Sequence, residues 1–231
     1  MAIKSIELDK KFNIVTQNPF SLTNRLLVPN TIIIDNDNFN GRELLLTLCL
    51  INYSLHSKKM NNNFSFSVIS ELGRMPTSYT AAPSVFQNKV EKIINNLLSY
   101  EVEINQKKEH LFTDIKLNQL TQSVNVVFSK NVFLTLIKGE KIDVDYSSLL
   151  TIPVNTIKLY LTILNTSGNK ITIKRNDIYR ILNASKNYRP TTISEKFLDP
   201  FIQDAAPLFN QLTCTILLIH KRLYAYEFEW N

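Results

Sequence analysis

The sequence predicts an α+β fold built from two tandem copies of one unit, and three observations support this. Residues 177–209 combine a short helix, a basic loop ending in Pro190 and a second helix, with one apolar strand-like run before them and two after. The first half of the chain has the same order of elements. The length, 231 residues, permits two compact domains of about 100 to 150 residues each. This layout, a helix-turn-helix with a β-hairpin wing, is that of a winged helix used twice.

In the first half, apolar residues recur at near-helical spacing over residues 41–56, which predicts a helix that the following polar cluster ends. Residues 26–35 before it form an extended apolar run interrupted by Pro29. After it we expect a short strand at 64–66, a short helix at 68–72 that a glycine stops, and a long amphipathic helix at 83–98. Residues 100–104 and 111–117 then form a hairpin that turns at 106–109. Alternating apolar residues over 124–128 predict the last strand of this half.

The second half repeats this order. A helix, a strand, a short helix, a longer helix and a closing hairpin are predicted, with the first three at 153–165, 171–173 and 177–182 and the hairpin strands at 213–220 and 223–230. An apolar pair followed by a tyrosine recurs with the same internal spacing, as Ile69, Leu72, Tyr79 and then Ile178, Ile181, Tyr188. The repetition indicates an internal duplication. We therefore expect one unit over residues 1–137 and a second over 138–231.

Positive charge gathers in the second unit. The chain has a formal net charge of +6 and a pI near 9.2, which suits a polyanionic partner. Between Gly168 and Lys196, seven lysines and arginines face only Asp177 and Glu195, which is a net +5 in one short stretch. Most of the excess charge therefore lies on the proposed helix-turn-helix.

Several enzyme classes lack their signatures. The sequence has no GxxxxGK[ST] phosphate loop, its three histidines are isolated, and Cys49 and Cys214 lie far apart without metal-site spacing. Asp143 and Asp145 resemble the paired carboxylates of Mg²⁺-dependent polymerases, but a polar strand edge is the better interpretation because no third acid accompanies them. We expect no catalytic residue, no metal and no cofactor.

The chain shows no targeting pattern. Its first residues mix charged and apolar side chains, unlike a signal peptide, and residues 44–55 form the longest apolar stretch, well short of the ~20 needed to cross a bilayer. The two cysteines suit a reducing compartment. We therefore expect a cytoplasmic protein with no membrane contact.

The second helix of the C-terminal unit and the loop before it carry the candidate DNA contacts. In a helix-turn-helix the N-terminal end of the second helix enters the major groove. Thr192 and Glu195 have capping-box spacing, which predicts the helix start, and Asp199-Pro200 predicts a kink further along. The candidates around this helix end are Lys186, Asn187, Arg189, Thr191, Thr192 and Lys196, and those at the tip of the wing are Lys221 and Arg222.

Each candidate has a competing structural interpretation. Capping alone explains Thr192, and charges at a turn such as Lys221 and Arg222 are often only solvated. Tyr188 matches Tyr79 in the repeat, which favours a packed structural residue over a base-stacking one. For Lys186, Arg189 and Lys196, convergence on one helix end favours contact with DNA.

Residues 152–230 carry a family resemblance. The segments PVNTIKLYLTIL, DIYRILN, FLDPFIQDA and the closing YEFEW resemble the C-terminal winged helix of iteron-binding plasmid replication initiators. The first half is similar to their N-terminal winged helix through FSVISELG and KVEKIINNLLSYEVEI. The resemblance implies binding to directly repeated origin sequences in double-stranded DNA, a homodimer formed through the N-terminal unit, and recruitment of the host replication initiator and the replicative helicase. It also implies four DNA contacts in the first unit, Arg74, Ser78, Ser84 and Lys89.

Two functions remain open from the sequence. One is an initiator that binds repeated sites at a plasmid origin. The other is a transcriptional regulator that uses paired winged helices on a palindromic operator without starting replication. Tandem repeats beside the gene would favour the first, and a single palindrome the second.

Overall fold

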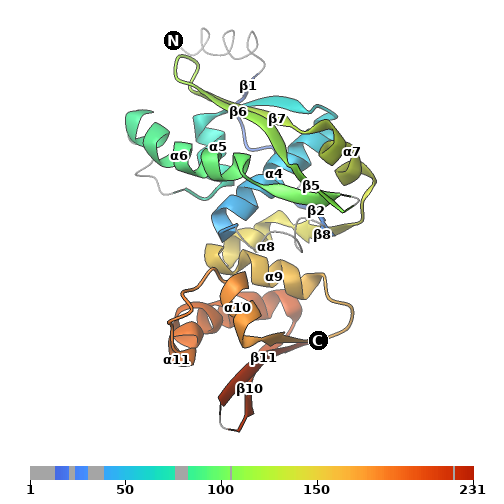
Figure 1. Cartoon of the computed structure of the whole chain (residues 1–231), viewed down its shortest axis with the longest axis vertical. Coiled ribbons are helices and arrows are strands. Elements are labelled where there is room, and N and C mark those ends of the chain that lie inside the picture. The colour runs from blue at the N-terminus through green and yellow to red at the C-terminus, as the bar shows by residue number, and fades with distance from the viewer. Residues whose placement is uncertain (1–13, 21–23, 31–38, 76–82, 105, 221) are drawn as a thin grey trace.

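The computed structural model describes residues 14–20, 24–30, 39–75, 83–104, 106–220 and 222–231. Two α+β units lie one above the other along the long axis of the molecule, the N-terminal unit at the top and the C-terminal unit at the bottom (Figure 1). Each contains a cluster of helices packed on a small sheet, which confirms the predicted fold class of two tandem winged helices. No helix among the described residues is long and apolar enough to cross a membrane.

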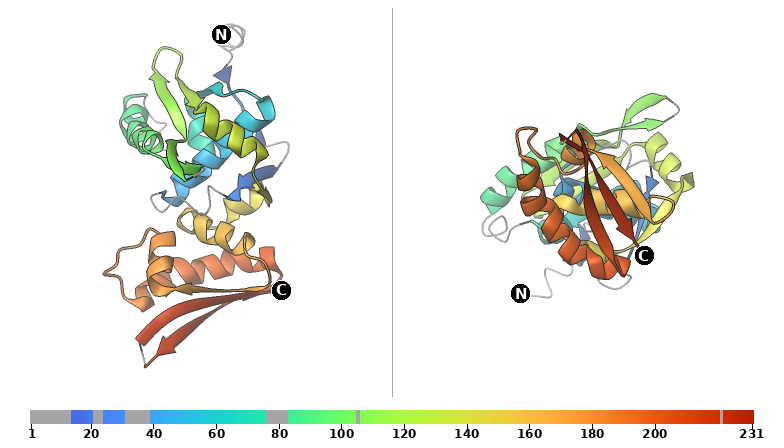
Figure 2. Two further views of the ribbon diagram at one scale, coloured as in Figure 1. Left: turned by 45° about the vertical axis from the view of Figure 1, so that its right-hand side comes forward. Right: turned by 90° about the horizontal axis from the view of Figure 1, so that it is seen from below.

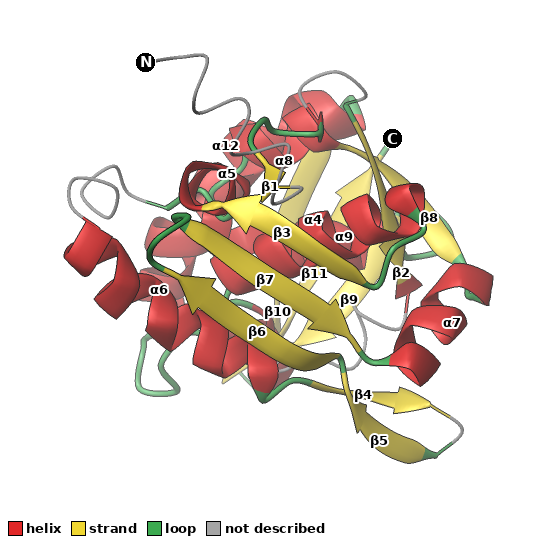
Figure 3. Cartoon of the chain, turned by 90° about the horizontal axis from the view of Figure 1, so that it is seen from above, coloured by secondary structure: helices red, strands yellow, loops and turns green. Residues whose placement is uncertain are grey.

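The N-terminal unit has a sheet with strand order β1-β3-β7-β6, which Figure 3 shows from above. Its helices are the buried α4, whose start Asn40 caps, the short α5, which ends at Gly73, and the long α6. The elements are β1 (Ile14–Val15), β2 (Arg25–Pro29), α4 (Gly41–Ser57), β3 (Asn61–Ser65), α5 (Phe66–Leu72), α6 (Pro83–Leu98), β4 (Glu101–Ile104), β5 (Lys107–His110), β6 (Phe112–Asn118) and β7 (Ser123–Phe128).

The predicted hairpin of 100–104 with 111–117 is wrong. The chain reverses at Gln106, which has a left-handed φ of 64°, so that β4 pairs with β5 in a separate two-stranded sheet. Opposite charges face each other across this pair, as in Glu103 opposite Lys108. Strand β6 instead pairs with β7 and forms the wing. A local turn and cross-strand charge pairs thus decided the pairing, which apolar alternation alone could not resolve.

The C-terminal unit has a sheet with strand order β10-β11-β9. It follows a linking segment in which β8 pairs with β2 of the N-terminal unit. The elements are α7 (Lys130–Lys138), β8 (Lys141–Asp145), α8 (Tyr146–Thr151), η2 (Val154–Thr156), α9 (Ile157–Leu164), β9 (Lys170–Lys174), α10 (Arg175–Ile181), α11 (Pro190–Ile193), η3 (Ser194–Leu198), α12 (Asp199–Ala205), η4 (Ala206–Phe209), β10 (Leu212–Ile219) and β11 (Arg222–Trp230).

The two units match element by element. Strand β9 and helix α10 of the second unit follow β3 and α5 of the first at one constant offset, the same offset that relates the repeated residues in the sequence. The strand order β3-β7-β6 corresponds to β9-β11-β10, so both wings join the sheet in the same way. Tyr79, the third member of the first sequence match, lies outside the described residues.

The segment from Pro190 to Phe209 departs from a simple helix. Pro190 is the first helical residue and Arg189 the N-cap, so the predicted capping box at Thr192 is wrong, because Thr192 already lies within the helix. Ahead of Pro200 the chain adopts a π-helical turn, η3, in which the Asp199 amide donates to the Ser194 carbonyl. The π-helix gives way to an α-helix at Asp199-Pro200, where proline has no amide hydrogen for the α-helical ladder, and the backbone stays right-handed helical at Leu198 and Asp199.

The two units are docked closely. The N-terminus of α4 meets η2 so tightly that a Cβ on Gly41 would lie 1.7 Å from the Val154 carbonyl oxygen. Arg25 and Asp143 form an ion pair across β2 and β8, and the Tyr146 amide donates to the Asn24 carbonyl over 2.9 Å. Buried residues of both units belong to one continuous hydrophobic cluster. The orientation of the units is therefore fixed by backbone contacts as well as by side chains.

Candidate nucleic-acid interface

The loop between α10 and α11 presents the predicted contact residues to solvent. The side chains of Lys186, Asn187, Arg189, Thr191 and Lys196 are exposed, and that of Thr192 is half-buried. Two anchors hold the loop, since the Tyr179 hydroxyl donates to the Tyr188 carbonyl over 2.7 Å and Ile193 is fully buried. The structure thus brings the polar candidates together around the N-terminus of one helix.

Tyr188 is a packing residue, as the repeat indicated. Its ring packs against the hydrophobic cluster and lies 6.5 Å from the ring of Phe197, centroid to centroid. The Lys196 ammonium sits over the same ring, 5.1 Å from its centroid. The aromatic ring therefore fixes Lys196 close to the helix start and leaves its charge exposed.

A hollow of about 540 Å³ lies beside this helix end. It is lined by Arg175, Asn176, Asp177, Tyr179, Arg180, Asn183, Ala184 and Lys186. Arg175 stacks over the Tyr179 ring at 5.5 Å, and Arg180 forms an ion pair with Asp177 at 3.1 Å. The sequence analysis counted Arg175 and Arg180 as charges but did not name them as contacts, although their i, i+5 spacing on a short helix before the basic loop was a usable signal.

The end of the wing in the C-terminal unit carries Arg222, one of the two predicted cations. Arg222 is exposed but begins β11 opposite Ile219, and the turn passes through His220, which has a left-handed φ of 50°. Lys221 lies outside the described residues. Apolar side chains are exposed beside Arg222, since Leu218 is 60% exposed and Ile219 49%. At the base of the wing the charge of Lys170 is used internally, in ion pairs to Glu227 and Glu229 at 2.8 and 3.0 Å.

Arg74, a predicted DNA contact of the first unit, has protein partners. It has a left-handed φ of 48°, and its Nη1 donates to the carbonyl oxygens of Leu149 and Ile152 over 3.1 and 2.8 Å. Burial lowers the pKa of the Arg74 guanidinium, and the nearby Arg42 lowers it further. Arg74 therefore joins the two units. Of the other candidates in this unit, Ser78 lies outside the described residues, and Ser84 and Lys89 are helical residues of α6.

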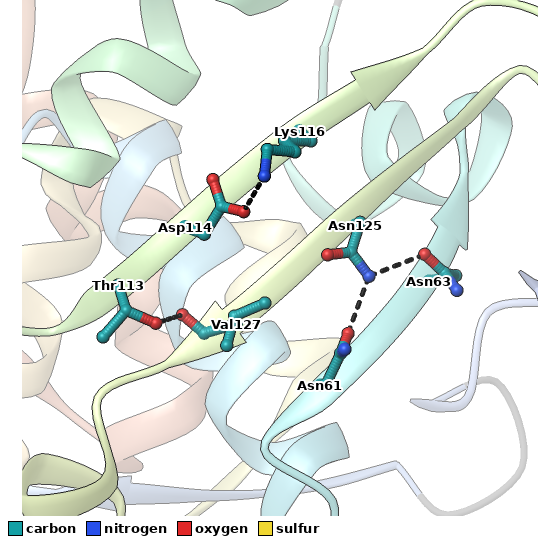
Figure 4. A network of polar contacts seen from close by, with 7 residues as sticks. All are labelled: Asn61, Asn63, Thr113, Asp114, Lys116, Asn125 and Val127. Atoms are coloured by element: carbon teal, nitrogen blue, oxygen red, sulfur yellow. Dashed lines mark hydrogen bonds and ion pairs between the residues drawn. The ribbon is translucent and has the colours of Figure 1, made fainter.

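The outer face of the N-terminal sheet is polar and neutral. Figure 4 shows the Asn125 amide donating to the side-chain oxygens of Asn61 and Asn63 across β7 and β3, over 2.6 and 2.8 Å. On β6 beside it, Lys116 forms an ion pair with Asp114 at 2.7 Å. These groups satisfy one another, so this face offers less uncompensated positive charge than the end of α11.

The paired acids near the linking segment are structural. Asp143 pairs with Arg25, and Asp145 caps α8 by accepting from Ser147. Burial raises the pKa of the Asp145 carboxyl, but hydrogen bonds from Ser147 and Ser148 outweigh it, so that pKa lies below its usual value. Among the described residues no group of three histidine, cysteine or acidic side chains could hold a metal ion. The partners of Asp143 and Asp145 fit their interpretation as a polar strand edge.

Comparison with known proteins identifies the fold through structure alone. No family model matches the sequence, and no curated protein gives a significant sequence match. The structure superposes on that of the Pi initiator protein in complex with iteron DNA, with a TM-score of 0.60 and 12% identity over 90% of this chain and 96% of the other. The chain has the fold of a replication initiator. Domains 2 and 3 of RctB also match, with a TM-score of 0.51 and 9% identity over 82% of this chain and 81% of theirs.

Proposed function

We propose that this protein binds repeated sequences in double-stranded DNA at a plasmid origin and thereby initiates replication. The observation that carries the proposal is the exposed basic end of α11, where Lys186, Arg189 and Lys196 converge on a helix N-terminus. Such an end combines cationic side chains for phosphates with amides and an asparagine that can contact base edges. The Pi structure, which shares this fold, holds iteron DNA and supports the choice of partner.

We propose different roles for the N-terminal unit, residues 1–137, and the C-terminal unit, residues 138–231. The C-terminal unit supplies the tighter DNA contact, because the loop before its helix α11 carries Lys186 and Arg189. The N-terminal unit contacts the adjacent part of the site through Ser78, Ser84 and Lys89 and also forms a homodimer. We further propose that the protein recruits the host initiator and the replicative helicase. It acts in the cytoplasm and performs no catalytic step itself.

Footprinting on the DNA that flanks the gene tests this proposal. We expect protection of several tandem repeats next to an AT-rich stretch. Each protected repeat should be shorter than a palindromic operator. Deletion of the repeats should abolish replication of a plasmid that depends on this protein. The absence of any protected sequence would contradict the proposal.

A transcriptional regulator is the second candidate. The exposed Leu218 and Ile219 near the end of the wing favour it, because they offer a surface for protein contact that a DNA-reading wing does not need. In that case the footprint would cover one palindrome at the promoter, and a plasmid lacking the protein would still replicate.

A further inference from the structure

A second basic cleft lies between the two units. It has a volume of about 690 Å³ and is bounded by the N-terminus of α4, one face of α6 and η2. The polar side chains that line it include Arg42, Asn88, Lys92, Asn96 and Asn155. Two of these are cationic and come from the N-terminal unit, whereas Asn155 comes from the C-terminal unit. We call this site the inter-unit cleft.

The side chains that line the inter-unit cleft carry a net positive charge, because Arg42 and Lys92 face the single carboxylate of Glu43. Neither Arg42 nor Lys92 forms an ion pair with a described residue, and the Arg42 Nε is buried without a hydrogen-bond partner among them. The one carboxylate in the lining, Glu43, is already bound by the Asn96 amide at 2.7 Å and the Tyr100 hydroxyl at 2.9 Å. A buried donor without a partner is destabilising, and a ligand with acceptor oxygens would supply the missing hydrogen bond.

The walls of the cleft are held in place. Gly41, beside Arg42, meets the Val154 carbonyl in a contact that admits no side chain, and Arg74 ties the loop after α5 to the end of α8. Positive charge on Arg74 also acts on Arg42, since each guanidinium lies in the field of the other. The cleft is thus a preformed, electropositive site rather than a gap between loosely joined domains.

The position of the cleft relative to the two reading helices suggests its ligand. Figures 1 and 2 draw α6 and α11 on the same side of the molecule, one in each unit, with the α4–η2 contact between them. When two helices enter successive major grooves, the protein surface between them faces the intervening sugar-phosphate backbone. Arginine and lysine are the side chains that bind phosphates in such positions, and asparagine amides support them.

We infer that the inter-unit cleft binds the DNA backbone between the two major grooves that α6 and α11 enter. Arg42 and Lys92 contact phosphates there, and Asn155 contributes an amide. This inference rests on the proposed function and adds a third contact point, supplied jointly by both units. It makes affinity depend on the docking of the units, because the phosphate site is complete only when η2 lies against α4.

The test uses the full chain and a duplex carrying one repeat recovered by footprinting. The variants are Lys92→Ala, Arg42→Ala and the double variant. The control is Lys138→Ala, an exposed lysine of α7, because α7 is drawn on the side away from α6 and α11 (Figure 1). We expect each cleft variant to lower the slope of log affinity against log salt by about 1 and the double variant by about 2. Lys138→Ala should leave the slope unchanged.

A second measurement locates the phosphates. Methylphosphonate groups, which remove the charge of single phosphates, are placed one at a time in the backbone between the two major grooves that α6 and α11 enter. We expect them to weaken the wild type and to have no further effect on the double variant. Because Arg42 is half-buried, thermal unfolding checks that its variant is folded, and the exposed Lys92 gives an independent result.

The outcomes separate the two proposals. Failure of the wild type to bind any footprinted duplex would contradict the proposed function. If the wild type binds and the salt slopes of Lys92→Ala and Arg42→Ala are unchanged, the inference is overturned and the proposed function stands. The same holds if both variants are still weakened by methylphosphonates between the two grooves.

Discussion

The two units share one fold but differ in the helices that we propose to read DNA. In the N-terminal unit α6 is a single regular helix of 16 residues, whereas the C-terminal counterpart is α11, of 4 residues, followed by the π-helical η3 and then α12. The first unit also has the additional hairpin of β4 and β5. The duplicated core therefore tolerates changes in the helix that would read DNA, which lets the two copies take different roles.

The two units also differ in the charge of their surfaces. The sheet face of the N-terminal unit is covered by asparagines that bond to one another, whereas the loop before α11 carries exposed lysine and arginine side chains. Uncompensated charge, more than the fold, separates a surface that binds DNA tightly from one that does not. Four predictions test or sharpen this comparison.

Replacement of Lys186, Arg189 and Lys196 together by alanine should have the largest effect. Loss of three charged contacts to phosphate should weaken binding to a footprinted repeat at least about a hundredfold and reduce the salt slope by about 3. Lys89→Ala in the N-terminal unit is the matched comparison, with a slope change of about 1. Equal effects per lysine in the two units would contradict the stronger role of the C-terminal unit.

Gly41→Ala tests the docking of the units. A glycine-to-alanine change near a helix start usually costs little, but here the new Cβ would lie 1.7 Å from the Val154 carbonyl oxygen, so backbone must move. We expect a loss of about 3 kcal/mol in the free energy of unfolding, measured in urea. Gly139→Ala, whose Cβ would lie 3.2 Å from the Thr135 carbonyl, is the control with a small effect. A neutral Gly41→Ala would show that the units are not held at this contact.

Arg74→Met separates the two interpretations of Arg74. The change keeps much of the side-chain stem but leaves the Leu149 and Ile152 carbonyls without their donor, which should cost about 2 kcal/mol of stability. If Arg74 acts only between the units, the salt slope of DNA binding should stay the same. A reduced slope at unchanged stability would instead support the DNA contact implied by the family resemblance.

Tyr179→Phe should have the smallest effect. It removes the hydrogen bond to the Tyr188 carbonyl that holds the basic loop, at a cost of about 1 kcal/mol. We expect a modest loss of DNA affinity, because the loop is less well ordered, with no change in salt slope. Tyr224→Phe, on the exposed wing, is the control and should change neither quantity.

Periodicity determined the elements that depend on local pattern. The bounds of α6, the end of α5 at Gly73 and the constant offset between the repeated elements were all visible in the sequence, because burial of one helix face imposes a repeat that does not depend on distant residues. The cluster of basic residues around α11 was visible for the same reason, since charge and a proline lie in one short segment.

Tertiary structure decided the rest. Pairing of β8 with β2 joins residues more than a hundred positions apart, and nothing in either strand specifies its partner. The family resemblance implied a DNA contact for Arg74, yet its guanidinium is directed to the carbonyls at the end of α8 by the docking of the two units. Local pattern sets which segments form helices and strands, whereas the choice of strand partner, the role of Arg74 and the inter-unit cleft follow from close packing of distant surfaces, which is a property of the folded chain alone.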